Sequence, residues 1–169
     1  EWLIADGLGG YAMGTEDFVR ARRYHGLLLV ASPISEQRFM LVNGVEAWLD
    51  TGRGRVALTA HRYAPNVVHP PNAARVTAFV AEPWPTWEYA YENEPVNSAG
   101  DRSQSRISFE VTGVHGNAAT ILRWRLVGSG PAMLHVRLLL SGRDWHALHH
   151  ENPAFAFAAE TTGAGSAAL

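Results

Sequence analysis

The sequence predicts an all-β protein, an antiparallel β-sandwich of about ten short strands with little or no helix. Short apolar runs are separated throughout by turn residues such as glycine, proline and asparagine. Within several runs apolar and polar residues alternate, as they do when one face of a strand is buried. No stretch of about 11 or more residues carries a convincing helical period. These observations favour a sandwich over a helical or mixed fold.

Composition and charge exclude several functions. The chain has 169 residues, 47% of them hydrophobic, which suits one domain with a sizeable core. The net charge of −2 offers no basic surface, so we expect neither nucleic acid nor membrane as a partner. All 14 basic residues are arginine, and cysteine is absent. Thiolate metal ligands, cysteine nucleophiles and lysine Schiff bases are therefore excluded, and we expect no metal and no cofactor.

The first element, residues 1–15, is rich in glycine. Its Gly7-Leu8-Gly9-Gly10 run superficially resembles a dinucleotide-binding loop. That loop needs a long apolar strand before it and an amphipathic helix after it, and neither is present. We therefore expect a tight, irregular entry to the first strands, in which glycine allows positive φ and close approach of the backbone.

The second element, Arg22–Ala31, is the one around which the chain is organised. Its aliphatic half has the length and composition of a buried strand. Its polar half, Arg22, Arg23, Tyr24 and His25, then lies at the mouth of that strand. Such residues either form a site held on a rigid element or are solvated arginines beside a strand cap.

The next two elements are predicted to be a hairpin and a further strand. Asn43-Gly44 stands between the apolar runs 39–42 and 45–49, and Asn-Gly in this position is the strongest short-range hairpin signal. A turn at 52–54 then leads into a strand over 55–60.

Residues 61–73 contain three prolines and are predicted to form a loop. His61 and His69 lie in this loop as conceivable metal ligands. No acidic residue or cysteine accompanies them, so a metal site here is not favoured.

A second hairpin is predicted over residues 75–92, with a first strand at 75–81, a connection at 82–85 and a second strand that follows it. Trp87, Tyr89 and Tyr91 alternate with polar or small residues and therefore share one strand face. Three aromatic side chains on one face are most often core. If they were exposed, they would form a flat platform on which sugar rings stack.

Three more strands follow, over 106–112, 122–126 and 134–140, each with alternating polarity. A last strand could begin at 155–158. The final stretch, 161–169, is interpreted as a loop or the end of a truncated fragment.

A second polar cluster, residues 141–152, follows the last long strand and contains Arg143, Asp144, Trp145 and His146. One interpretation is a metal or acid–base site, because histidine and carboxylate are its usual parts. The interpretation we favour is a hydrogen-bonded or ligand-lining loop in which Asp144 orients His146 or pairs with an arginine. Because both clusters flank core strands, this segment could meet residues 22–26 in space.

The order of these motifs resembles that in the N-terminal domain of the bacterial and archaeal type of glycogen debranching enzyme (amylo-α-1,6-glucosidase). The most specific agreement is Arg22-Arg23-Tyr24-His25-Gly26, followed much later by Arg143-Asp144-Trp145-His146. Weaker agreement lies at Glu1-Trp2-Leu3, Gly7–Ala12, His69-Pro70, Phe79, Pro85–Trp87, Leu138–Leu140 and His150–Asn152.

The resemblance implies a β-sandwich, residues 1–169, that precedes a separate (α/α)6 barrel carrying the catalytic carboxylates. Nothing marks a catalytic carboxyl pair here, so we expect this fragment of a cytoplasmic glycoside hydrolase to be non-catalytic alone. Its expected partners are an α-glucan (glycogen or limit dextrin) and the C-terminal catalytic domain of the same chain. Alternatives are a free-standing carbohydrate-binding module and a purely structural docking domain.

The resemblance also directs the choice of site residues. Those expected to bind substrate or to face the barrel are Arg22, Arg23, Tyr24, His25, Asp144 and His146. Two tryptophans, Trp87 and Trp145, are the expected sugar-stacking residues.

Overall fold

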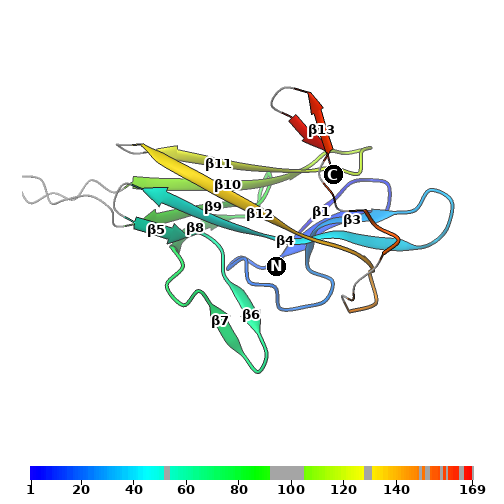
Figure 1. The fold of residues 1–169 in the computed structure, drawn as a ribbon, viewed down its shortest axis with the longest axis horizontal. Helices are drawn as coiled ribbons and strands as arrows, with labels where there is room; N and C mark the ends of the chain where they lie inside the picture. The colour runs from blue at the N-terminus through cyan, green and yellow to red at the C-terminus, as the bar shows by residue number, and fades with distance from the viewer. Residues whose placement is uncertain are drawn as a thin grey trace, which may run out of the picture.

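The computed structural model describes residues 1–51, 54–91, 105–127, 131–148, 150, 153–156, 158, 160–163 and 166–168. The described residues form β-strands, turns and loops, with no helix among them (Figure 1). None of them therefore belongs to a helix with the length and hydrophobicity needed to cross a bilayer. The predicted all-β, antiparallel fold is confirmed.

Two antiparallel sheets make up the sandwich. The first has the order β1-β2-β3-β4-β12, with β5 also paired to β4, and the second has the order β11-β10-β9-β8. The strands of the first sheet are β1 (Trp2–Ala5), β2 (Tyr11–Gly14), β3 (Gly26–Ala31), β4 (Arg38–Thr51), β5 (Gly54–Ala57) and β12 (Ala132–Asp144). Those of the second are β8 (Arg75–Val80), β9 (Thr86–Tyr91), β10 (Ser105–Gly113) and β11 (Thr120–Val127).

The hydrophobic core lies between these sheets. Alternate residues of β4 meet alternate residues of β9 and β10, including Val45, Ala47, Leu49, Trp87, Tyr89, Ile107, Phe109 and Val111. The ring of Phe109 stacks on Trp87 at 5.3 Å and on Trp124 at 4.6 Å between centroids. The core interpretation of Trp87 and Tyr89 is thus confirmed, since both side chains are almost fully buried. Tyr91 ends β9, and its side chain lies outside the described part of the chain.

The predicted Asn43-Gly44 turn is wrong. Both residues lie inside the continuous strand β4 and are buried. Val42 pairs with Leu140 and Gly44 with Leu139, so Asn43 is an extra residue at a β-bulge. Strand pairing on both sides of β4 has overridden the local turn preference.

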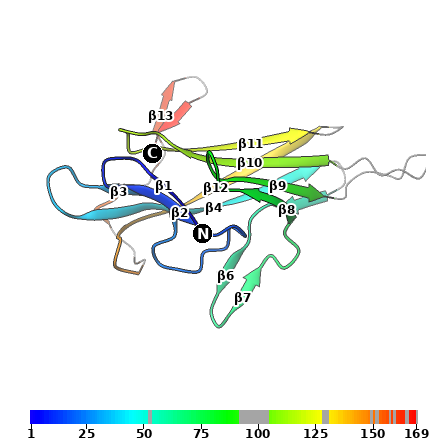
Figure 2. The ribbon, with the colours of Figure 1, turned by 180° about the vertical axis from the view of Figure 1, so that it is seen from behind.

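The predicted loop at 61–73 is also wrong in part. It contains a small hairpin of β6 (His61–Tyr63) and β7 (Val67–His69). None of its three prolines lies inside a strand, because Pro65 is in the turn and Pro70 and Pro71 follow β7. The hairpin projects away from both sheets in both ribbon views (Figures 1 and 2).

The strand expected from residue 155 and the loop expected over 161–169 are both wrong at the residues that the structure describes. Phe155, Ala156 and Ala158 belong to no strand, and Phe157 lies outside the described residues. A hairpin of β13 (Glu160–Gly163) and β14 (Ser166–Ala168) occupies most of the stretch that was expected to be a loop.

The glycine-rich entry forms the β1–β2 hairpin rather than irregular structure. The buried carboxylate of Asp6 accepts hydrogen bonds from the backbone N–H groups of Leu8, at 2.7 Å, and Gly10, at 2.9 Å. Gly7 and Gly9 have φ of 80° and 96°, which only glycine adopts freely. Residues 7–10 therefore form a turn that the Asp6 carboxylate stabilises through these two hydrogen bonds.

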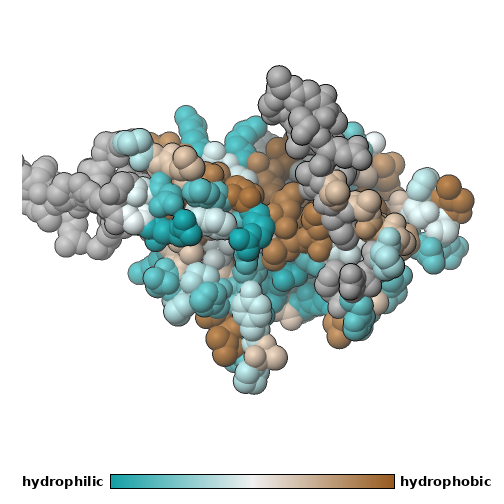
Figure 3. Space-filling view, viewed as in Figure 1, coloured by the Kyte–Doolittle hydropathy of each residue, from teal (hydrophilic) through white to brown (hydrophobic). Residues whose placement is uncertain are grey.

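Apolar side chains of β12 are exposed along one side of the sandwich. Leu134, Val136 and Leu138 on β12 lie opposite core residues of β4, yet are 36–44% exposed. The apolar surface appears where β12 crosses in front of the second sheet (Figure 3). An apolar pocket of about 550 Å³ lies here, with walls that include Leu27, Leu122, Leu138, Leu140 and Phe155.

Candidate functional site

The two polar clusters meet at one end of the first sheet. Met40 of β4 pairs with Leu29 of β3 on one side and with Arg143 of β12 on the other. The segment before β3 and the end of β12 therefore emerge beside each other. A β-bulge in β12 helps to bring these segments together. Gly142 lies in this bulge with φ of 66° and turns the chain just before Arg143.

Arg143 is the centre of this junction and is only 7% exposed. Its Nε donates to Oδ1 of Asn43 at 3.1 Å. Its Nη1 donates to three carbonyls of its own loop, of which the shortest contact is 2.9 Å to Ala147. Its Nη2 donates to the carbonyl oxygen of Arg23. Burial is the main cause that lowers the pKa of Arg143 from its ordinary value, and the positive charge of Arg20 is the second.

Three further contacts join the clusters at the surface. Nη1 of Arg23 donates to the carbonyl of His146 at 2.9 Å. The hydroxyl of Tyr24 lies 3.2 Å from Nδ1 of His146. The Tyr24 ring lies 5.5 Å from that of Trp145, centroid to centroid. The predicted meeting of the two segments is confirmed by these contacts.

Trp145 and Asp144 shape the loop that carries His146. The Trp145 ring is half-buried and lies beneath the guanidinium of Arg38, at 5.0 Å. Asp144 accepts a hydrogen bond from the backbone N–H of His146 at 2.8 Å. Asp144 thus orients the backbone of His146, while the His146 ring takes its orientation from Tyr24.

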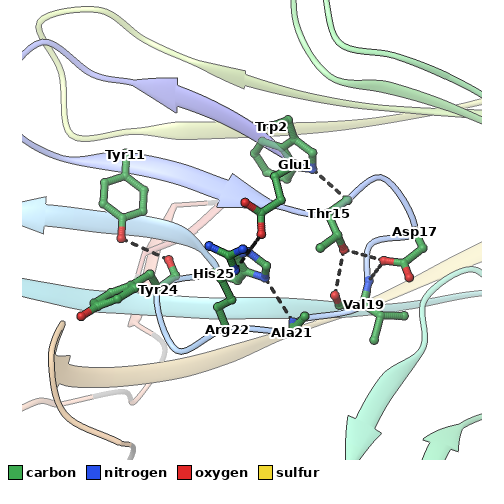
Figure 4. Close-up of polar contacts among 10 residues, drawn as sticks. All are labelled: Glu1, Trp2, Tyr11, Thr15, Asp17, Val19, Ala21, Arg22, Tyr24 and His25. Atoms are coloured by element: carbon green, nitrogen blue, oxygen red, sulfur yellow. Dashed lines mark hydrogen bonds and ion pairs between the residues drawn. The ribbon is translucent and has the colours of Figure 1, made fainter.

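His25 and Arg22 point to the other side of the same loop, toward Glu1 (Figure 4). His25 is 1% exposed, and its Nδ1 accepts the backbone N–H of Ala21 at 3.1 Å. Nδ1 is therefore unprotonated, and Nε2 carries the proton that faces Glu1 Oε1 at 3.2 Å. Nε of Arg22 lies 3.0 Å from the same oxygen. These contacts brace the loop.

Tyr11 adds a further brace. Its hydroxyl donates to the carbonyl of Tyr24 at 3.1 Å (Figure 4). Burial raises the pKa of Tyr11, which keeps its hydroxyl a donor. Asn43, Glu1, Tyr11 and Arg38 were not anticipated, because their partners lie far away in the sequence.

Trp87 does not belong to this site. Its side chain is completely buried in the core, and its Nε1 donates to the carbonyl of Glu16 at 2.7 Å. The expected sugar-stacking role of Trp87 is corrected, because no face of its ring is open to a ligand. In the second polar cluster, residues 141–152, the positions of His149, Glu151 and Asn152 lie outside the described residues.

The junction presents side chains of the types that could bind and position a ligand. Exposed donors of Arg23, the His146 ring and the half-buried rings of Tyr24 and Trp145 lie within one surface. Among the described residues, no three histidine, aspartate or glutamate side chains are grouped so that they could hold a metal ion. Aromatic faces beside polar side chains suit a ligand with both apolar and hydroxyl-bearing surfaces.

Comparison with known proteins adds one finding. A family described as "Glycogen debranching enzyme N terminal" matches residues 1–168. The search of curated proteins found no match, and neither did the search of solved structures.

Proposed function

The chain belongs to the glycogen debranching enzyme N-terminal family, and from that membership we propose that it serves a glycoside hydrolase acting on α-1,6 branch points of glycogen or limit dextrin. In this role it is one β-sandwich domain that supports a catalytic barrel elsewhere in the same polypeptide. Part of its surface lines the glucan cleft. The barrel carries the catalytic carboxylates, so the sandwich alone is non-catalytic.

The junction centred on Arg143 is the observation that carries this proposal. A buried guanidinium with several backbone carbonyls as partners is a device for holding loops in one conformation. The loops held in this way present Arg23, Tyr24, Trp145 and His146 at the surface. A rigid support behind exposed polar and aromatic side chains is what a binding surface requires.

Each surface residue has a distinct role in the proposal. Tyr24 or Trp145 packs against the apolar face of a glucose ring, as aromatic side chains commonly do with flat apolar surfaces. Arg23 donates hydrogen bonds to sugar hydroxyls. Arg22, His25 and Asp144 have structural roles, since Glu1 and the His146 backbone engage them.

Calorimetric titration with a linear maltooligosaccharide and with a branched limit dextrin tests the proposal. In the enzyme that contains this domain, Arg23→Ala is expected to weaken debranching without lowering the unfolding temperature by more than a few degrees. Arg125→Ala, an exposed arginine on β11, is the matched control. Unchanged debranching together with unchanged stability in Arg23→Ala would remove the proposal.

A docking role is the second candidate, because a specific observation favours it. The exposed apolar residues of β12 and the pocket beside them form a surface of the kind that packs against protein. The free-standing binding module loses its support, because its proposed platform of Trp87 and Tyr89 is buried.

A further inference from the structure

Strand β12 has a free edge. On one side it pairs with β4 along nearly its whole length, and within the described part of the chain no strand pairs with its other side. From Ala132 to Leu139 the pairing with β4 is regular, and the register shifts only after Leu139. Along residues 132–139 the backbone N–H and C=O groups of alternate residues therefore point outward from a straight, extended edge.

This edge lacks the features that normally keep strand edges from pairing. Proteins protect a free edge with a proline, a bulge or a charged side chain that points inward. Residues 132–139 contain no proline and no bulge. Their core-facing row includes Leu134, Val136 and Leu138, which lie opposite core residues of β4 and yet are partly exposed. A regular edge beside an exposed apolar row is a surface to which another strand adds.

The charges on the outer face of this edge are compensated within the chain. His135 and Arg137 point away from the core, because side chains alternate along a strand. Nη1 of Arg137 lies 3.0 Å from Oε2 of Glu46 on β4. Nε2 of His135 lies 3.7 Å from Oδ2 of Asp50, an oxygen that also pairs with Arg55 at 3.1 Å. When two such edges meet, each basic side chain brings its own carboxylate, so charge repulsion does not keep two copies apart.

Few symmetric registers are possible for two antiparallel copies of β12. Side chains that lie opposite each other must point to the same face, so the twofold axis passes through a residue and not between two residues. An axis at Val136 sets Val136 opposite its own copy and Leu134 opposite the partner's Leu138. An axis at His135 would set two histidines against each other and Ala132 opposite the partner's Leu138. The register centred on Val136 therefore gives the better apolar pairing along the core-facing row.

We propose that β12 pairs with β12 of a second copy of this chain, antiparallel and in the register centred on Val136. The two first sheets then join into one continuous sheet, and the exposed apolar row of each copy is covered by that of the other. Because both copies contribute the same strand, the assembly closes as a twofold dimer. The second copy is thus the partner of the docking surface introduced above, and its assignment rests on that candidate and not on glucan binding. The Arg143 junction lies beyond the paired run and stays open.

Sedimentation equilibrium of the chain over a range of concentrations tests this pairing. The unsubstituted chain is expected to reach twice the monomer mass. Val136→Lys and Val136→Glu are each expected to be monomeric, because each sets two like charges opposite one another. An equimolar mixture of the two is expected to regain the dimer mass, since opposite charges then meet. Ile121→Lys on β11 is the matched control, because Ile121 is 48% exposed and Val136 44%, and it should stay dimeric.

A single cysteine gives a second test that adds no charge to the edge. The chain contains no cysteine, so Val136→Cys carries one thiol. In the proposed register this thiol lies opposite its own copy, with Cβ atoms about 4.5–5.5 Å apart. Mild oxidation is expected to convert most of the Val136→Cys chain into a disulfide-linked dimer. Ile121→Cys, on an edge that takes no part in the pairing, should remain largely monomeric under the same conditions.

Several results would overturn the pairing. A chain that stays monomeric at the highest concentration reached does so, as do assemblies larger than a dimer or a dimer that persists in Val136→Lys. If the charged variants do not fold, the yield of the Val136→Cys cross-link decides in their place. Arg23→Ala should leave the dimer mass unchanged. A dimer that binds no glucan would therefore remove the proposed glucan surface alone, and a monomer that binds glucan would remove the pairing alone.

Discussion

Nε of Arg143 donates to Oδ1 of Asn43 at 3.1 Å, and this contact joins two buried side chains 100 positions apart in the sequence. It links the bulge in β4 to the bulge in β12. The junction therefore depends on the shape of the guanidinium as well as on its charge.

Arg143→Lys is expected to lower the free energy of unfolding by about 2–4 kcal/mol, because an ammonium group cannot reach the Asn43 and Arg23 oxygens together and leaves buried acceptors unpaired. Urea denaturation measures the change. Arg125→Lys on the exposed side of β11 is the control and should change stability by less than about 0.5 kcal/mol. Equal stability of the two variants would contradict the role given to Arg143.

The two buried histidines should differ in how much stability the same substitution costs. His25→Phe removes the acceptor for the Ala21 N–H and the donor for Glu1, so a loss of about 1–3 kcal/mol is expected. His61→Phe removes nitrogens that have no partner, so no loss is expected at pH 7. Chemical denaturation of both variants is the measurement, and a similar loss in both would contradict the assigned contacts.

Stability should depend on pH through His61. Its folded-state pKa is lowered by burial, so below about 6.5 the unfolded chain takes up a proton that the folded chain resists. The wild-type protein should therefore lose up to about 2 kcal/mol more than His61→Phe between pH 7.5 and pH 5. Urea unfolding at both pH values gives this difference. Parallel losses in the two proteins would show that His61 titrates normally.

Two glycines of the first sheet should differ sharply in tolerance to alanine. A Cβ on Gly26 would overlap the sulfur of the buried Met40, so Gly26→Ala is expected to cost about 1–3 kcal/mol. A Cβ on Gly44 would lie 3.5 Å from Arg20, an ordinary contact, so Gly44→Ala should be neutral within about 0.5 kcal/mol. Thermal unfolding compares them. A large loss in Gly44→Ala would favour the Asn-Gly turn that the structure lacks.

Local pattern was sufficient to predict some elements. Ile107, Phe109 and Val111 alternate with polar residues, and this alternation correctly predicted β10 and the face it buries. Trp87 was correctly favoured as core for the same reason. Alternation reports on burial directly, because successive strand side chains point to opposite faces.

Other elements depend on distant contacts that local pattern does not contain. Asn43-Gly44 has the composition of a turn, but β3 and β12 both pair along β4 and keep it extended. The meeting of Arg23 with His146 was predictable in outline, since each follows or precedes a core strand. That Asn43 would supply the acceptor for Arg143 was not, because their contact depends on two bulges.

The continuity of β4 limits how this sequence can change in length. Asn43 serves the junction and Glu46 pairs with Arg137 on the outer face of the first sheet, and about 10 Å of extended chain separates Asn43 from Glu46 at about 3.3 Å per residue. Deleting or inserting a single residue between them would exchange the two faces, moving Glu46 toward the core and Val45 toward solvent. A point substitution in this stretch changes one side chain and leaves the register of β4 intact. A single-residue insertion or deletion shifts the register and therefore disrupts both surfaces at once.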